Sequence, residues 1–267
     1  PKSYQKKIAE FLTTIDDKIA LNNRINTELE QMAKTIYNYW FVQFDFPNEE
    51  GKPYKTSGGE MVWNEELKRE IPKGWKDGKL SNFANITTGK LDSNAEKIGG
   101  KYPFFTCAPE PSTIDKYAFD DNVILVAGNN ASGNFHVSKY KGQFNAYQRT
   151  YVITSKVDVN QEFLYQVIKR EMSLLKTKGN GSQTKFITLN MLTDIKIPVV
   201  SEAIMKKFHE LNSSMYEKQM ILSRETQELI QLRDFLLPLL MNGQVTIQET
   251  EEENLLMAAE PSINYSK

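Results

Sequence analysis

The sequence has one cysteine, two histidines and no long apolar run among its 267 residues. Cys107 has no second cysteine to pair with, which excludes an internal disulfide framework and favours a reducing compartment. No run approaches the roughly 18 to 20 apolar residues that cross a bilayer. No charged start followed by an apolar stretch indicates a secretory signal. We therefore expect a cytoplasmic protein that does not contact a membrane.

Motifs for catalysis and metal binding are also missing. The stretch "IGGK" at 98–101 lacks the glycine spacing and the Ser/Thr of a phosphate-binding loop. "FDFP" at 44–47 has one proline, so it does not complete the Asn/Asp-Pro-Pro-aromatic tetrad of adenine methyltransferases. His136 and His209 are far apart and have no cysteine pair beside them, so no zinc site is predicted. We expect no catalytic residue, no metal and no cofactor in this chain.

Charge is nearly balanced overall, with a net value of −1, which argues against a generic polyanion binder. The charges are unevenly distributed along the chain, because residues 134–196 hold ten Lys or Arg against four Asp or Glu. Such asymmetry is typical of a nucleic-acid-binding face on an otherwise neutral protein. An ordinary solvated surface rich in lysine explains the charges equally well.

The chain repeats one helical sequence near its two ends. "QKKIAEFLTTIDDKIALNNRINTELEQ" at 5–31 aligns without a gap with "MKKFHELNSSMYEKQMILSRETQELIQ" at 205–231. Lys6 and Lys206, Arg24 and Arg224, and other residues are identical at this offset of 200. Common residues in two amphipathic helices explain some identities, but a gap-free offset indicates a duplicated structural unit.

Apolar residues recur at three- and four-residue steps in both copies, which predicts two amphipathic helices of about 40 residues and about 60 Å. Neither helix can bury its stripe alone, so we expect them to form an antiparallel coiled coil; separate packing on the central domain is the alternative. Asn22 shares a core position with the apolar residues and predicts lower stability with a fixed register. Pro47 should close the first helix and Pro238 should kink or break the second. The predicted helix-pair residues are Ile8, Phe11, Ile15, Asn22, Leu29, Phe208, Leu211, Met215, Leu222 and Leu229.

Between the helices the sequence predicts one mixed α/β domain, so the fold class is α+β. Strands are expected at "YPFFTC", "NVILVAG", "GNFHVS" and "YQRTYVITS", and a helix at "NQEFLYQVIKREMSLLKTK". The predicted organisation begins with a first long helix at 1–46 and a linker at 47–71 that holds one short strand near 60–63. The mixed domain follows at 72–200, then a second long helix at 201–244 and an acidic tail at 245–267.

Three loops combine glycine, amide or hydroxyl side chains and a cation: "TTGKLDSN" at 87–94, "GNNASGNFHVSKYK" at 128–141 and "KTKGNGSQTK" at 176–185. Asn, Gln, Arg and Lys can bond base edges, and Ser, Thr and lysine can hold phosphates. Surface loops are polar in any protein, but three of them around a basic segment favour DNA reading. The predicted DNA contacts are Thr88, Lys90, Asn129, Asn130, Ser132, Lys139, Lys141, Gln148, Arg149, Lys178, Asn180, Ser182, Gln183 and Lys185.

From Lys2 to Ile247 the sequence resembles the specificity subunits of Type I restriction-modification systems. The matching pieces are "IPKGW" with "TTGK", "DDNVILVAGNNASGN", "GNGSQTKFITLNMLTDIKIPVV" and the helix starts "QKKIAEFLTTIDDKIALNN" and "SEAIMKKFHELNSSMYEKQ". The second helix departs from the family pattern, since Met215 and Tyr216 replace an Ile-Asp-like pair. Family members carry two target-recognition domains, so one domain between two helices suggests a truncated product, a split-gene product or a segment of a longer chain.

The resemblance implies a non-catalytic, sequence-specific DNA-binding subunit that reads half of a bipartite target and functions in host defence through DNA methylation. Its implied partners are double-stranded DNA, two methyltransferase subunits and a restriction/motor subunit; a homodimer is a further option. S-adenosylmethionine and ATP with Mg²⁺ are expected on the partner subunits, in a bacterial or archaeal cytoplasm at the nucleoid. Two alternatives remain open: the reading end of a fused single-chain restriction-modification enzyme, and a coiled-coil interaction protein without DNA binding.

Overall fold

A computed structural model of the chain describes residues 2–130, 135–157, 160–178 and 186–247. By its internal contacts the chain divides into two compact units. One comprises residues 31–215, and the other combines 1–30 with 216–267. We call them the domain unit and the helix-pair unit.

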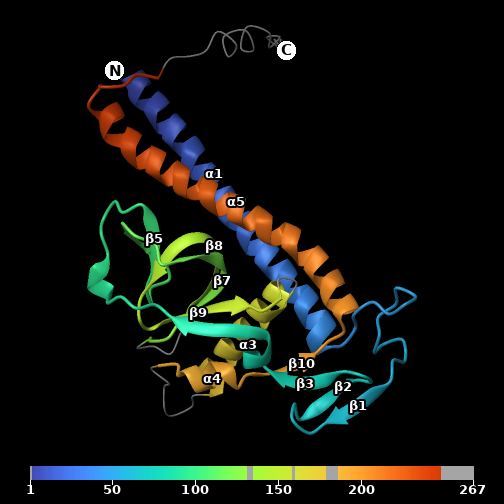
Figure 1. The fold of residues 1–267 in the computed structure, drawn as a ribbon. Coiled ribbons are helices and arrows are strands. Elements are labelled where there is room, and N and C mark those ends of the chain that lie inside the picture. Colours follow the sequence, from blue (N-terminus) through green and yellow to red (C-terminus); the bar gives the residue numbers. More distant parts are fainter. Residues whose placement is uncertain (1, 131–134, 158–159, 179–185, 248–267) are drawn as a thin grey trace, which may run out of the picture. The chain divides into compact units, whose positions relative to one another are not determined.

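The helix-pair unit is built from the N-terminal part of α1 (Lys2–Tyr37) and the C-terminal part of α5 (Glu202–Met241), which lie side by side (Figure 1). Asn22 Nδ2 donates to Glu225 Oε2 over 2.8 Å, and Arg233 Nη1 donates to Asp16 Oδ1 over 2.9 Å. Later residues of α5 therefore meet earlier residues of α1, so the helices run in opposite directions. This confirms the predicted antiparallel pair.

The buried seam differs from the predicted one. Writing Ile8, Ile15, Asn22 and Leu29 as heptad position a, the second buried or half-buried position is e, occupied by Leu12, Ile19, Asn26 and Ala33. The prediction placed Phe11 and Leu211 in the seam, at position d, and it is wrong for both, because they are 36% and 47% exposed. Polar side chains take their place: Asn26 Nδ2 donates to Ser223 Oγ over 3.3 Å, and Gln219 Nε2 donates to the Asn26 carbonyl over 3.2 Å. A pattern of apolar residues does not predict such a seam, because part of it is polar.

The remaining predicted scaffold residues lie at different depths. Ile8, Ile15, Asn22 and Leu222 are buried in the helix-pair unit, while Leu29 and Leu229 are half-buried. Met215, also half-buried, and Phe208 belong to the domain unit. Phe208 lies in the hydrophobic core of that unit, so its predicted place in the helix seam is wrong.

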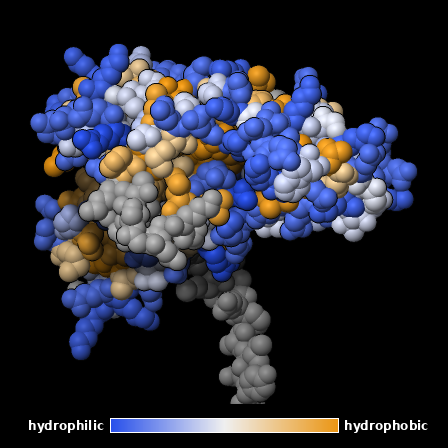
Figure 2. Space-filling model, turned by 90° about the horizontal axis from the view of Figure 1, so that it is seen from below, coloured by the Kyte–Doolittle hydropathy of each residue, from blue (hydrophilic) through white to orange (hydrophobic). Residues whose placement is uncertain are grey.

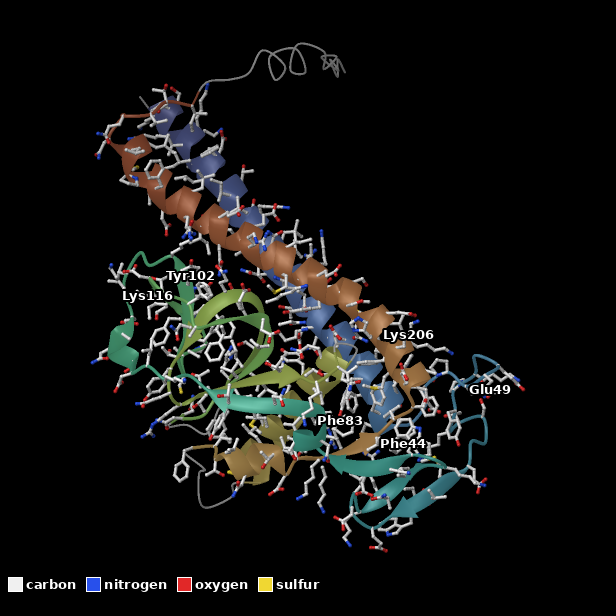
Figure 3. The ribbon with its side chains drawn as sticks, in the orientation of Figure 1. Phe44, Glu49, Phe83, Tyr102, Lys116 and Lys206 are labelled. Atoms are coloured by element: carbon white, nitrogen blue, oxygen red, sulfur yellow. The ribbon has the colours of Figure 1, made fainter. Side chains whose placement is uncertain are left out.

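The first long helix ends earlier than Pro47. Its α-helical part stops at Tyr37 and continues as one π-helical segment, Asn38–Val42. Trp40 and Phe41 of this segment are buried, and the Phe41 ring lies 4.8 Å from that of Phe163 and 4.9 Å from that of Phe208. Phe44 (labelled in Figure 3) then adopts φ 67°, a left-handed conformation that is costly without glycine. The π-helical segment thus places two aromatic rings in the core of the domain unit.

Pro238 does not break the second helix. α5 continues through it to Met241, although proline cannot donate to the carbonyl one turn earlier. The end follows one turn later at Gly243, with φ 67° and its N–H donating to the Leu240 carbonyl. A left-handed glycine is a common helix terminator, so glycine sets the boundary.

The domain unit holds a six-stranded mixed sheet with the order β4-β9-β7-β8-β5-β6 (Figure 1). Its strands are β4 (Ala84–Thr88), β5 (Tyr102–Phe105), β6 (Ser112–Ile114), β7 (Phe119–Ala127), β8 (Val137–Ala146) and β9 (Thr150–Ser155). Only β5 and β8 pair in parallel among these described strands. The apolar residues 123–127 make β7 the buried centre of the sheet. The predicted strands at β5, β7 and β9 are confirmed.

Two small sheets and short helices complete the domain unit. β1 (Met61–Asn64) and β2 (Arg69–Pro72) form a hairpin inside the segment predicted as a linker, which confirms the one expected strand and adds its partner. β3 (Lys76–Lys79) pairs with β10 (Lys196–Val199), and α2 (Leu80–Phe83), α4 (Leu189–Thr193) and a 3-10 turn (Ser93–Ala95) lie in the connections. α3 (Gln161–Lys178) packs its apolar residues into the core, as predicted for that helix.

Candidate nucleic-acid interface

Backbone hydrogen bonds bring several predicted loops together in the domain unit. The Gln148 N–H donates to the Leu91 carbonyl over 2.8 Å, which joins the loop after β4 to the turn between β8 and β9. Gly128 N–H donates to the Arg149 carbonyl over 2.8 Å, so the loop after β7 joins the same turn. Ile187 N–H donates to the Gly128 carbonyl over 2.8 Å and adds the segment before α4. Four chain segments thus meet at one place.

Two glycines permit this close approach. A Cβ on Gly89 would lie 1.9 Å from the Ala146 carbonyl oxygen, and one on Gly128 would lie 2.4 Å from the Arg149 carbonyl oxygen. Both distances are far below van der Waals contact, so only glycine fits without a backbone shift. Gly89 and Gly128 therefore allow the loops to approach one another closely enough for their backbones to meet.

Side chains with base-reading chemistry stand at the convergence. Lys90, Asn129, Gln148 and Arg149 are exposed, and Thr88 is half-buried. Amides can bond adenine bidentately and arginine can do the same to guanine. We define these five residues as the convergence site. They come from the predicted loops 87–94 and 128–141 and from the turn between β8 and β9, which holds Gln148 and Arg149.

Lys139 and Lys141 were predicted to lie in the loop 128–141, and this is wrong for both. They belong to β8, paired with Ile124 and Asn122 of β7. Lys139 Nζ lies 4.5 Å from the ring centroid of Tyr165 on α3. The strand predicted at "GNFHVS" overlaps only the first two residues of β8. The rest of β8 was not predicted because it is mostly polar, and its pairing with the apolar β7 is a tertiary effect.

Asn130 is half-buried and lines a cavity of about 360 Å³ together with Cys107, His136 and Lys169. Burial lowers the pKa of His136 below its ordinary value, which favours the neutral imidazole at neutral pH. Ser132, Asn180, Ser182, Gln183 and Lys185 lie outside the described residues, as does the side chain of Lys178.

Within the described part of the chain, no three His, Cys, Asp or Glu side chains gather where they could hold a metal ion. None of its helices combines the length and the apolar content that crossing a bilayer requires.

A second group of polar side chains escaped sequence reasoning. Lys34 and Asn38, at the end of α1 and in the π-helical segment, line a groove with Gln166, Lys169 and Arg170 of α3. The spacing of 166, 169 and 170 on a predicted helix was a usable signal, because residues three and four apart share a face. Their meeting with residue 34 depends on tertiary packing and could not be read from the sequence.

Comparison with known proteins identifies the family. Residues 72–229, more than half of the chain, match the family of the Type I restriction modification DNA specificity domain. The Type I restriction enzyme EcoDI specificity subunit of Escherichia coli is 36% identical over 189 residues, 69% of this chain and 42% of that protein. The MjaIX specificity subunit of Methanocaldococcus jannaschii is 24% identical over 92% of this chain and 59% of its own length.

Solved structures agree on the fold. The S subunit of a Type I restriction-modification system from M. genitalium has a TM-score of 0.61 at 19% identity, covering 94% of this chain and 62% of that one. The chain thus spans roughly two fifths to three fifths of the relatives it matches. With a family match over more than half its length and a 36% identical relative over more than two thirds of it, the chain belongs to the Type I restriction modification DNA specificity domain family.

Proposed function

We propose that this chain is a non-catalytic DNA-reading subunit of a Type I restriction-modification complex that recognises one half of a bipartite target. The observation that carries the proposal is the convergence site, where exposed Lys90, Asn129, Gln148 and Arg149 from three segments meet in one domain. Amide and guanidinium groups on loops joined by backbone hydrogen bonds have the chemistry of base recognition. Membership of a DNA specificity family supports this assignment.

The test of DNA reading compares adenine methylation across the genome in cells with and without this gene. We expect methylation at one bipartite motif to disappear when the gene is removed. The variant Arg149→Ala should lose or alter the motif, whereas Lys206→Ala, a matched exposed cation on α5, should keep it. Unchanged methylation after removal of the gene would refute the proposal.

The proposed partners are two methyltransferase subunits, with a restriction/motor subunit added to them. Exposed apolar residues interrupt an otherwise largely hydrophilic surface on the face that Figure 2 shows. On the long helices they recur in equivalent positions of the two repeats, between 36% and 60% exposed: Phe11 and Leu211, Leu21 and Ile221, Met32 and Leu232. These residues occupy the same position in each copy of the duplicated sequence. Matching exposed apolar residues in both repeats support binding of two identical partners.

The stoichiometry of the assembled complex tests this second part. Leu21→Ser changes the first repeat and Ile221→Ser the second, and neither residue is buried. We expect native mass spectrometry with the co-expressed methyltransferase to show one subunit lost in each single variant and both lost in the double variant. Thr27→Ser, at another exposed position of α1, is the control. A double variant that retains both subunits contradicts the assignment.

In this proposal S-adenosylmethionine and ATP with Mg²⁺ are bound by the partner subunits, and the complex works at the nucleoid in the cytoplasm. A homodimer of this chain is the alternative assembly, and the mass of the isolated chain at increasing concentration distinguishes it. A monomer without partners that becomes a heterotrimer with two methyltransferase subunits is the expected result.

A further inference from the structure

A groove in the domain unit lies between the end of α1 and α3. One wall is formed by Lys34 and Tyr37 of α1 and by Asn38, and the other by residues 166, 169, 170, 173 and 174 of α3. These spacings place each set on one helix face. The groove encloses about 240 Å³, below the roughly 300–1,000 Å³ of pockets for small organic ligands. It therefore suits a small group rather than a whole cofactor.

The groove is lined by cations without acids. Lys34, Lys169 and Arg170 contribute three positive charges, and none of the described residues that line the groove is acidic. Arg170 Nη1 lies 3.3 Å from Glu171 Oε1, and Lys169 Nζ donates to the Tyr165 hydroxyl over 3.3 Å. Burial raises the pKa of Tyr37 to about 12, so its hydroxyl is a neutral donor. The positively charged lining of the groove therefore favours binding of an anion.

Gln166 provides the second, independent observation. Its side chain is only 5% exposed and lines the groove, and no hydrogen-bond partner for its amide is found in the described part of the chain. Neither amide atom of Gln166 is among the fully buried, unpaired side-chain atoms of the described residues, so the amide is open to the groove and can bond a ligand there. A ligand that accepts a hydrogen bond from Gln166 and is attracted by three cations would satisfy both observations.

We propose that this groove binds a backbone phosphate of the DNA duplex, a contact in addition to those of the convergence site. The inference rests on the proposed DNA-reading function and adds to it. Ammonium, guanidinium, amide and hydroxyl donors are the groups that proteins use for DNA phosphates, and such contacts fix the position of the protein on the duplex. Tyr165 links the groove to a predicted DNA contact, because its ring lies 5.4 Å from Lys169 Nζ and 4.5 Å from Lys139 Nζ.

Three variants of the full chain test the site. Lys34→Gln removes an exposed charge, and Gln166→Leu removes the buried amide without changing charge. Lys206→Gln, on α5 (labelled in Figure 3), is the matched charge control at another exposed lysine. Fluorescence anisotropy with a labelled random-sequence duplex over a salt series gives the dissociation constant and its salt dependence. Melting temperatures report folding.

We expect Lys34→Gln to weaken duplex binding about tenfold and to lower the slope of log affinity against log salt by about 0.9, one phosphate contact. Gln166→Leu should weaken binding by a similar factor with little change of slope, and should melt at or above the wild-type temperature. A merely structural role for Gln166 predicts no change in binding. Lys206→Gln should bind like the wild type.

The other outcomes are also decisive. If both groove variants bind like Lys206→Gln while the wild type binds the duplex, the groove is not a phosphate site and the proposed function stands. If the wild type does not bind any duplex, the proposed function itself fails. If inorganic phosphate raises the melting temperature through Lys34 but duplex binding does not depend on Lys34, the groove holds a free anion and the inference is overturned.

Discussion

Replacing Asn22 with valine should stabilise the helix pair. Asn22 is fully buried at a core position, and its Oδ1 has no partner among the described residues, while Nδ2 bonds Glu225. Removing an unpartnered buried acceptor recovers about 1–3 kcal/mol, and burying a valine side chain adds about 1.5–3 kcal/mol. The lost bond costs about 1.5–3 kcal/mol. Glu225 itself remains partly exposed and 3.4 Å from Lys18, so it is not left isolated.

At the midpoints of these ranges, the terms favour Asn22→Val by about 2 kcal/mol in the free energy of unfolding. Urea unfolding followed by helical circular dichroism measures this difference. Asn23→Val makes the same substitution at the neighbouring exposed position and should stay within about 0.5 kcal/mol of the wild type. If Asn22→Val is less stable than the wild type, the polar seam contributes more through its bonds than it costs through burial, and the reasoning is wrong.

Three further changes test the fold. Phe41→Ala removes a 1% exposed ring from the aromatic core and should cost about 3–5 kcal/mol in urea unfolding. Hydrogen bonds from Thr56 lower the pKa of Asp45, so the ionised carboxylate stabilises the fold above its unfolded pKa of about 3.9. This stability is lost as pH falls through the lower pKa of the folded state. Asp45→Asn should therefore be less stable at pH 7, and its melting temperature should fall less steeply with acid. Pro238→Ala restores a helix N–H and should raise the melting temperature, whereas a fall would show that proline is preferred there.

The sequence was sufficient for the helices and for the centre of the sheet. Periodic apolar residues over about 30 positions determine α1 and α5, and the run around 123–127 determines β7, since each pattern is local. The seam was only partly predictable. Asn26 and Thr226 lie at core positions, although polar residues are not expected there from an apolar pattern. Phe11 is exposed, although the same pattern predicts that it is buried.

The residues of the candidate site were partly predictable from the sequence, but their arrangement was not. Glycine-rich polar loops marked Lys90 and Asn129, and the stretch "AYQRTY" marked Arg149, from residue types alone. Their convergence depends on bonds between segments far apart in the chain, such as Gly128 to Ile187, and no local pattern encodes it. The part of β8 that contains Lys139 and Lys141 was not predicted for a related reason, because β7 supplies the apolar surface on which a polar strand pairs.

The helix pair crosses at equivalent stretches of the repeat. The polar layer joins residues 22–26 of α1 to residues 219–225 of α5, whose counterparts in the first repeat are 19–25. Two copies of one sequence present each exposed feature twice, once in each repeat. Phe11 and Leu211, although misplaced as seam residues, recur in this duplicated pattern. Apolar residues left out of the seam by polar neighbours are thus available, in two copies, for the two identical partners proposed above.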